Sequence, residues 1–220
     1  MLLIIVEVRI LKNLYIIGAG GYAKSVIDSL NLYQYHIKGF IDEFKTGTHI
    51  GYPIVSDTIE AIDDYKDNVF FIAIGDNYHR MKWYIELKKR ECVLINIVDK
   101  TAIVSNQAQI GEGCFIGKMA IVNSMVTTGN NCIINTKSLI EHGSRIGDHV
   151  NISTNTVLNG DVQVKDMAFI GSSSVVNGQI SIGFNSLIGS GSVVVKSVED
   201  NVVVVGVPAK LLKRRDISGL

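Results

Sequence analysis

The sequence predicts a small Rossmann-like α/β domain over residues 1–97, followed by a left-handed parallel β-helix over residues 98–220. Two observations lead to this fold class. The second part carries an uninterrupted six-residue repeat, and the first part alternates strands and helices around a glycine-rich turn. The chain has 220 residues, a length that suits one large domain or two small ones.

The repeat divides the chain from Ala102 to Ser197 into six-residue blocks without an insertion. The third residue is Ile, Leu or Val in fifteen of the sixteen blocks, which is typical of a stacked solenoid. We expect these side chains to point inward and three blocks to close each eighteen-residue coil. We expect the Gly or Asn found at many fourth positions to take the strained backbone at the corners. The third positions are Val104, Ile110, Ile116, Val122, Thr128, Ile134, Ile140, Ile146, Ile152, Leu158, Val164, Ile170, Val176, Ile182, Ile188 and Val194.

The N-terminal part reads as a βαβ unit, because its apolar runs have the length of buried parallel strands and are separated by turns and helical segments. The first run is followed by the glycine turn 18–21, and a helix with an apolar face begins there. The second run ends on a carboxylate, and the third is closed by Gly75-Asp76-Asn77. The predicted elements are strands 14–17, 36–42, 69–74 and 93–96, a helix after residue 21 and a helix over 78–90.

The glycine turn predicts a site for an anionic group, since backbone N–H groups and the helix dipole meet there. Gly20 and Gly21 would face the ligand, and Asp42 would hold a ribose hydroxyl. Gly75 and Asn77 complete the expected substrate site. The third glycine of a full dinucleotide motif is replaced by Ala23, and the unit is short. We therefore expect a nucleotide or sugar group rather than a redox cofactor, with a fold relic that only packs on the solenoid as the alternative.

Composition excludes several classes of function. The chain has 21 basic and 21 acidic residues, so no charge excess predicts a nucleic-acid or anionic membrane partner. Three cysteines do not form a disulfide framework, which fits a cytoplasmic protein, and no metal site is expected. The apolar segment 1–6 is too short to span a bilayer and has no leader pattern. Residues 1–11 are either an extra edge strand or an over-long translation start.

His142 is the strongest catalytic candidate because it is the fifth residue of its block, where a side chain projects outward beside a corner. Gly160 lies eighteen residues later and is expected one coil above, at a spacing of about 4.8 Å. A base next to a free N–H is what acyl transfer requires, for proton removal and for oxyanion stabilisation. Ser172 and Ser190 form a second such column, flanked by glycines, along which an extended pantetheine arm could lie. A merely structural column of small residues is the alternative.

Several short segments of this sequence, taken together, resemble the bacterial sugar O- and N-acetyltransferases that include the NeuD-type sialic acid O-acetyltransferases. Three further strings look most like the sialic acid branch. The general resemblance lies in residues 18–21, 40–43, 73–77, 95–99, 140–142 and 206–210, and the branch-specific one in residues 138–143, 151–155 and 176–179.

The resemblance implies an acetyl-CoA-dependent enzyme of surface polysaccharide biosynthesis that works as a homotrimer, with active sites between solenoids. His142 would be the base, and Gly160 would hold the oxyanion. Gly20, Gly21 and Asp42 would meet the nucleotide or sugar. The implied acetyl-CoA contacts are Asn151, Ser172, Ser190, Pro208, Ala209 and Lys210.

Two positions depart from the family pattern. Gly143 stands where the amino-sugar enzymes have an acidic residue after the histidine, and Asn151 stands where they have a second histidine. Asp148 and Asp161 are the acids that could compensate for Gly143. We therefore expect O-acetylation of sialic acid or of an activated sialic acid. N-acetylation of a nucleotide-linked amino sugar, or a non-catalytic role in stabilising a sialic acid biosynthetic enzyme, are the alternatives.

Overall fold

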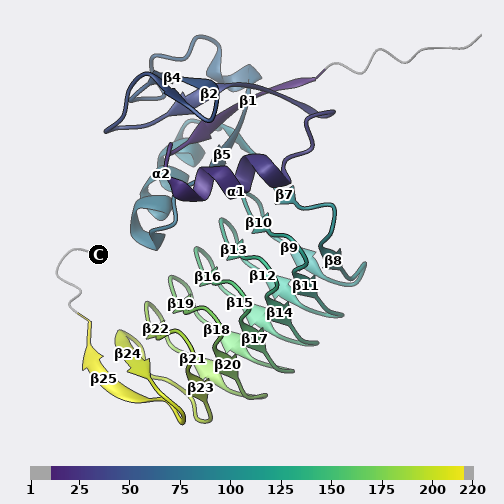
Figure 1. Ribbon diagram of the computed structural model, residues 1–220, viewed down its shortest axis with the longest axis vertical. Coiled ribbons are helices and arrows are strands. Elements are labelled where there is room, and N and C mark those ends of the chain that lie inside the picture. The colour runs from purple at the N-terminus through teal and green to yellow at the C-terminus, as the bar shows by residue number, and fades with distance from the viewer. Residues whose placement is uncertain (1–10, 216–220) are drawn as a thin grey trace, which may run out of the picture.

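The computed structural model describes residues 11–215 and contains a small α/β domain on one end of a long β-solenoid (Figure 1). The predicted fold class is confirmed. The expectation for residues 1–10 lies outside the described part of the chain.

The N-terminal domain is a six-stranded sheet with the strand order β3-β4-β2-β1-β5-β6 and a helix on each face. Strands β2, β1, β5 and β6 run parallel, as the βαβ pattern predicts. The hairpin of β3 and β4 was not predicted, because its strands are short and β4 contains a proline. The elements are β1 (Lys12–Ile17), α1 (Gly21–Ser29), β2 (Tyr35–Ile41), β3 (Thr48–His49), β4 (Tyr52–Ser56), a 3-10 turn (Tyr65–Asp67), β5 (Val69–Ile72), α2 (Asn77–Lys89) and β6 (Val93–Leu94).

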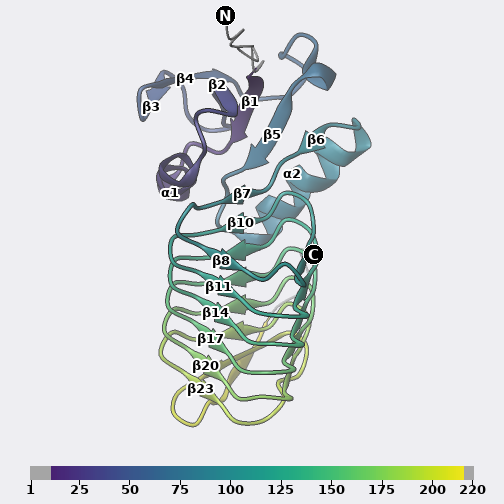
Figure 2. The same cartoon turned by 90° about the vertical axis from the view of Figure 1, so that its right-hand side faces the viewer.

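The solenoid is built from two-residue strands on three faces, visible as a stack of coils in Figure 2. Sheet pairing joins residues eighteen apart, such as Ile121 with Leu139, so the predicted coil length is confirmed. The first face contains β7 (Ile97–Val98), β10 (Phe115–Ile116), β13 (Ile133–Ile134), β16 (Asn151–Ile152), β19 (Phe169–Ile170) and β22 (Leu187–Ile188). The second contains β8 (Ile103–Val104), β11 (Ile121–Val122), β14 (Leu139–Ile140), β17 (Val157–Leu158), β20 (Val175–Val176) and β23 (Val193–Val194). The third contains β9 (Gln109–Ile110), β12 (Thr127–Thr128), β15 (Arg145–Ile146), β18 (Gln163–Val164) and β21 (Ser181–Ile182).

The third residue of each block forms the solenoid core, as predicted. Ile140, Leu158 and Val176 are fully buried members of one continuous aliphatic column. Burial of such side chains stabilises the fold by about 1.5–3 kcal/mol each. The two stacked cysteines, Cys114 and Cys132, are buried and unpaired within this core.

The expected role of the fourth-position glycines was wrong. The left-handed backbone falls at the sixth position of every block from Gly113 to Gly191, and glycines such as Gly129 and Gly171 do not take it. They are needed because the next coil passes too close: a Cβ on Gly171 would lie 2.5 Å from the Ser190 backbone nitrogen. Close approach of two coils, not turn strain, therefore selects glycine there.

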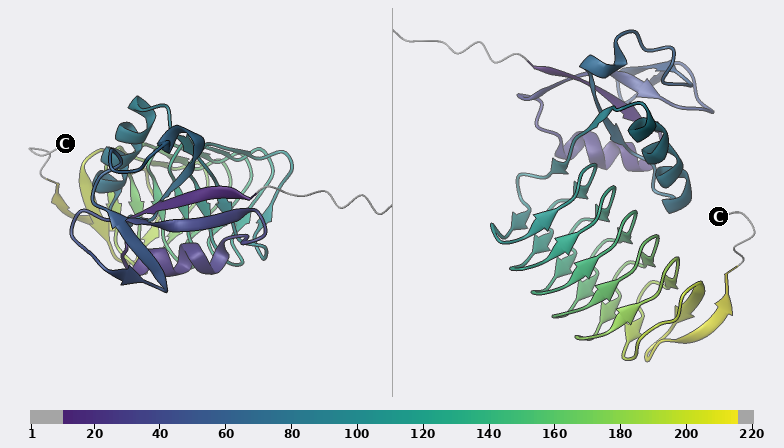
Figure 3. Two further views of the ribbon diagram at one scale, coloured as in Figure 1. Left: turned by 90° about the horizontal axis from the view of Figure 1, so that it is seen from above. Right: turned by 180° about the vertical axis from the view of Figure 1, so that it is seen from behind.

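The two domains share a hydrophobic core. Helix α1 contributes Ala23 and Val26, and the first face of the solenoid contributes Ile97, Phe115 and Ile133. Strand β6 is the last strand of the N-terminal sheet, and β7 already belongs to the solenoid. At the opposite end, β24 (Val202–Val205) and β25 (Lys210–Arg214) form an antiparallel hairpin that closes the solenoid (Figure 3).

Candidate functional site

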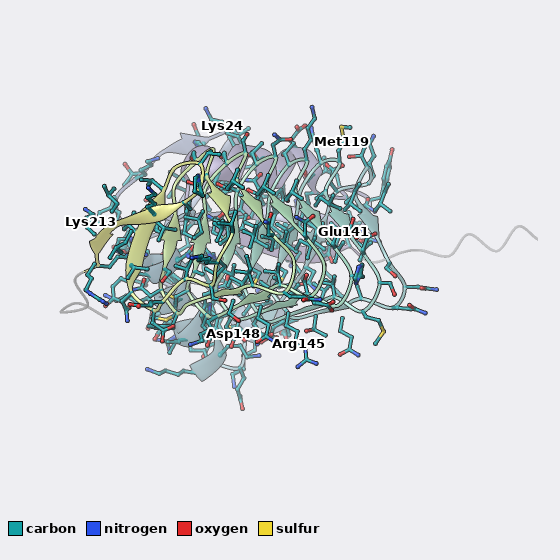
Figure 4. All side chains as sticks on the ribbon, turned by 90° about the horizontal axis from the view of Figure 1, so that it is seen from below. Lys24, Met119, Glu141, Arg145, Asp148 and Lys213 are labelled. Atoms are coloured by element: carbon teal, nitrogen blue, oxygen red, sulfur yellow. The ribbon has the colours of Figure 1, made fainter. Side chains whose placement is uncertain are left out.

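Three corners run the length of the solenoid, and each predicted catalytic residue can be assigned to one of them. The first corner joins the first face to the second, the second corner joins the second face to the third, and the third corner closes the coil. Figure 4 marks one side chain from each corner: Met119 from the first, Glu141 from the second and Asp148 from the third.

His142 and Gly160 meet on the second corner, as the block spacing predicts. A Cβ on Gly160 would lie 2.6 Å from Cε1 and 2.8 Å from Nε2 of His142, so the imidazole ring rests directly on Gly160. The Asp161 N–H donates to the His142 carbonyl at 2.9 Å and fixes the two coils to each other. Only glycine fits beneath the ring.

The Gly160 N–H is available to a ligand. Within residues 11–215, it donates no hydrogen bond to a backbone or side-chain acceptor. Gly178 lies one coil further on, where a Cβ would be 3.0 Å from the Gly160 carbonyl oxygen. The column that His142 begins is therefore glycine in the next two coils. It pairs an exposed imidazole with a free donor, the arrangement that acyl transfer requires.

Ser172 and Ser190 also stack, but on the first corner. The Gly191 N–H donates to the Ser172 carbonyl at 2.9 Å, which holds the two coils in register. The first and second corners are the opposite edges of the second face. One chain therefore does not bring these serines to His142.

The C-terminal residues Pro208, Ala209 and Lys210 lie where the terminal hairpin turns over the last coil. The Ala209 N–H donates to the Val193 carbonyl at 2.8 Å. Since Val193 belongs to β23, this turn lies beside the end of the second face. Ser190 and residues 208–210 thus gather at the C-terminal end of the solenoid.

Asn151, Gly75 and Asn77 lie together at the junction of the two domains. The Asn151 side chain donates to the Gly75 carbonyl at 3.3 Å, and Asn77 donates to the carbonyls of Met167 and Ala168 at 2.9 and 3.1 Å. Asn77 and Asn151 are buried. The structure gives all three residues a role in domain contact, and their predicted contacts with substrate or acetyl-CoA stay predictions.

Arg80 organises the same junction and was not identified from the sequence. It is fully buried, and its guanidinium donates to five acceptors in both domains. Burial lowers the pKa of Arg80. No spacing rule marks one arginine among the charged residues of α2, so the sequence carried no signal for it. The acceptors are the carbonyls of Ile74, Gly75, Asn131 and His149 and the side-chain oxygen of Asn77.

A cavity of about 370 Å³ opens beside the glycine turn in the N-terminal domain. Asp42 anchors this turn, because its carboxylate accepts hydrogen bonds from the N–H groups of Ala19, Phe44 and Lys45 at 2.6, 3.0 and 3.0 Å. The Lys45 ammonium donates to the Ala19 carbonyl at 2.6 Å. The cavity lining combines cationic, aromatic and glycine residues, among them Gly18, Gly20, Asp42, Lys45, His79, Lys82 and Trp83.

The structure thus brings Gly20 and Asp42 together at the cavity, with Gly21 as the first residue of α1. Across residues 11–215, no cluster of three or more His, Cys, Asp or Glu side chains is arranged to hold a metal ion. No helix in this range is long and apolar enough to cross a membrane.

Comparison with protein families finds that residues 13–87 match the family described as the PglD N-terminal domain. An uncharacterized protein of Acanthamoeba polyphaga mimivirus is 36% identical over 103 residues, which are 47% of this chain. The chain spans about a fifth of that curated relative, since the matched part is 21% of its length.

Solved structures match nearly the whole chain. A mutant of perosamine N-acetyltransferase from Caulobacter crescentus, in complex with CoA and GDP-perosamine, is 31% identical with a TM-score of 0.87. This match covers 92% of this chain and 97% of that one. The acetyltransferase domain of PglB from Neisseria gonorrhoeae is 26% identical with a TM-score of 0.88 and coverages of 91% and 100%. WeeI from Acinetobacter baumannii is 29% identical with a TM-score of 0.82 and the same coverages.

Proposed function

Because the chain belongs to the β-helix sugar acyltransferases with a PglD-type N-terminal domain, we propose that it acetylates the amino group of a nucleotide-linked amino sugar, using acetyl-CoA. The observation that carries this proposal is the His142 imidazole resting on Gly160, whose N–H is free. The named acceptor among the similar proteins is GDP-perosamine, and that protein is an N-acetyltransferase. The similar structures therefore favour N-acetylation of a nucleotide-linked amino sugar, the alternative, over sialic acid O-acetylation, the first expectation.

His142 and Gly160, on the second corner, each have a definite part in this reaction. The His142 imidazole accepts the proton that the acceptor amine loses as its nitrogen attacks the thioester carbonyl. The Gly160 N–H donates to the oxygen on which negative charge develops. His142 then returns the proton to the departing CoA thiolate, so the enzyme ends the cycle unchanged.

The order of elements along the solenoid supports separate binding sites for the acceptor and for acetyl-CoA, on opposite sides of His142. The N-terminal domain with its cavity packs on the first coils, while Ser172, Ser190 and the turn 208–210 lie toward the other end (Figure 1). We assign the nucleotide to the cavity and acetyl-CoA to the C-terminal coils. The acceptor and the thioester then meet at the coil that carries His142.

We assign a homotrimer to this enzyme, because the second face carries an aliphatic stripe that one chain leaves uncovered. The outward residue of every second-face strand is Ile, Leu or Val, and Ile103 is 64% exposed. The outward residues of the third face are polar. The stripe consists of Ile103, Ile121, Leu139, Val157, Val175 and Val193.

Three copies packed through this stripe place the second corner of one copy beside the first corner of the next. His142 of one copy would then share a cleft with the Ser172–Ser190 column of its neighbour. This arrangement explains how two columns that lie apart in one chain can serve one site. The three unpaired cysteines suit a cytoplasmic enzyme, since a reducing compartment keeps them free.

The test is a thiol-release assay with acetyl-CoA and a panel of acceptors: GDP- and UDP-linked 4-amino sugars, sialic acid and CMP-sialic acid. We expect turnover with an amino sugar and a loss of at least about a hundredfold in kcat for His142→Ala. His36→Ala, an exposed histidine on β2, is the matched control and is expected to keep full activity.

Turnover only with the sialic acids would instead support O-acetylation, the second candidate, which the strings 138–143, 151–155 and 176–179 favour. Unchanged turnover in His142→Ala would rule out the catalytic scheme. If no acceptor is used while a sialic acid biosynthetic enzyme is stabilised on mixing, the protein acts as a non-catalytic partner.

A further inference from the structure

The residue after the base, Gly143, has no side chain, and a carboxylate from the next coil fills the space that one would occupy. A Cβ built on Gly143 would lie 2.1 Å from Oδ1 of Asp161 and 3.2 Å from its Cγ. Asp161 is therefore turned back toward the coil of His142 rather than away from it. Its carboxylate stands where an acid following the histidine would begin.

The backbone fixes Asp161 to the same place. Its N–H donates to the His142 carbonyl at 2.9 Å, and the preceding residue, Gly160, carries the imidazole ring. Asp161 and Gly143 both have the left-handed backbone of a sixth position, with φ of 60° and 69°. The two positions are thus equivalent sites on adjacent coils, and a carboxylate can be supplied from either.

Few other charges lie on this corner. Glu141 turns toward the backbone, since its Oε2 accepts from the His142 N–H at 3.4 Å. The coil below His142 presents Ser124 and Met125, and the coil above Asp161 presents Gly178 and Gln179, all uncharged. Arg145, labelled in Figure 4, is exposed at the start of β15 on the third face. Asp161 is therefore the carboxylate whose charge can favour a protonated imidazole.

We propose that Asp161 is a positioning residue for His142, supplying from the next coil the negative charge that Gly143 does not. This inference rests on the proposed acetyl transfer. Within residues 11–215 there is no direct ion pair between the two side chains, so Asp161 acts through space. The proton passes from the amine to His142 and then to the thiolate, and none is transferred to Asp161.

The first measurement needs no acceptor. The full chain, labelled with ¹³C-histidine, is titrated by NMR, and the His142 signal is assigned from its absence in His142→Ala. In Asp161→Asn we expect the midpoint of this titration to fall by about half a pH unit, because a neighbouring negative charge favours the imidazolium. The difference should vanish at 1 M salt, which screens exposed charges over about 3 Å. A purely structural role would not respond to salt, and an unchanged midpoint would overturn the proposal.

The second measurement is kinetic, with the acceptor that gives turnover. We expect Asp161→Asn to lower kcat by about five- to tenfold and to move the acidic limb of the pH profile to lower pH, with the KM for acetyl-CoA within about twofold. Glu141→Gln is the matched control, since it removes the other carboxylate of the corner, and we expect its rate and profile to match the unmutated chain.

Exchanging the residues at positions 143 and 161 tests whether the negative charge matters, rather than Asp161 itself. Gly143→Asp alone would collide with Asp161 and is expected to lose activity, whereas Gly143→Asp with Asp161→Gly moves the carboxylate back one coil and should recover most of it. Loss of activity in His142→Ala but not in Asp161→Asn would overturn this inference and leave the proposed function standing. Full activity in His142→Ala would instead remove the proposed function itself.

Discussion

At the scale of the residue, the site depends on what is missing as much as on what is present. His142 can lie flat on the next coil only because Gly160 has no Cβ. The same glycine leaves its N–H exposed beside the ring. In the proposed reaction, Gly160 would therefore both make room for the base and supply the donor for the oxyanion.

Gly160→Ala tests this dependence. The new Cβ would lie 2.6 Å from Cε1 of His142, closer than real contacts allow, so the ring must leave its position. We expect kcat to fall by about a hundredfold, in line with the loss of an oxyanion donor and a misplaced base, while the melting temperature changes little. Ser124→Ala, at the same block position one coil below His142, is the control. Equal losses in both variants would contradict the scheme.

At the scale of the element, each coil is stabilised by the same column of inward-pointing side chains. The free energy that one of these side chains contributes depends on how many neighbours cover it. Val176 in β20 is fully buried, whereas Val98 in β7 holds the same inward position at the open first coil and is 46% exposed. The same side chain thus occurs in two environments within one repeat.

Shortening these valines should have unequal effects. We expect Val176→Ala to lower the free energy of unfolding by about 2–3 kcal/mol, through lost burial and a cavity. Val98→Ala should cost less than about 1 kcal/mol, since part of its surface is already in water. Chemical denaturation of both variants gives the comparison, and a larger loss at Val98 would show that the column is not the main source of stability.

His149, on the third corner, makes stability depend on pH. Burial lowers its pKa below the ordinary value of 6.5, and its Nδ1 is 3.0 Å from the Asn131 side-chain nitrogen. The unfolded chain takes up a proton at this histidine before the folded chain does, so stability is lost as pH falls below about 6.5. In His149→Asn, which suits the left-handed backbone at this position, the fall in melting temperature between pH 6.5 and 5 should be smaller than in the unmutated chain. An identical fall in both proteins would assign the effect to other groups.

At the scale of the whole molecule, the arrangement of faces decides where a complete site can form. The uniform aliphatic stripe on the second face separates the two functional corners in one chain and would join them between copies. The N-terminal domain is held on the third corner by Arg80 and Asn77, so its cavity keeps a fixed height relative to His142.

Val157→Asp tests the assembly, since it places a charge in the middle of the stripe. In sedimentation analysis we expect the unmutated protein at three times the 24.0 kDa of the chain and this variant at the mass of one chain, with acetyl transfer lost. Gln163→Asp on the polar third face is the matched control and should remain assembled and active. A trimeric Val157→Asp protein would exclude the second face as the interface.

The sequence by itself determined the fold and the pairing of His142 with Gly160 in the candidate site. A solenoid with a constant coil of eighteen residues turns distance along the chain into position in space, so Gly160 could be placed over His142 by counting. The N-terminal strands were predicted for a similar reason, because buried parallel strands are apolar runs.

Only the tertiary structure decided the rest. The contacts of Arg80, Asn77 and Asn151 join residues 51 to 91 positions apart across a domain junction, and no period relates such positions. The direction in which Asp161 turns depends on the space left by Gly143 one coil away, which is a property of packing. The role of the fourth-position glycines was misjudged for the same reason, since a repeat shows that glycine is required but not whether the backbone angle or the neighbouring coil requires it.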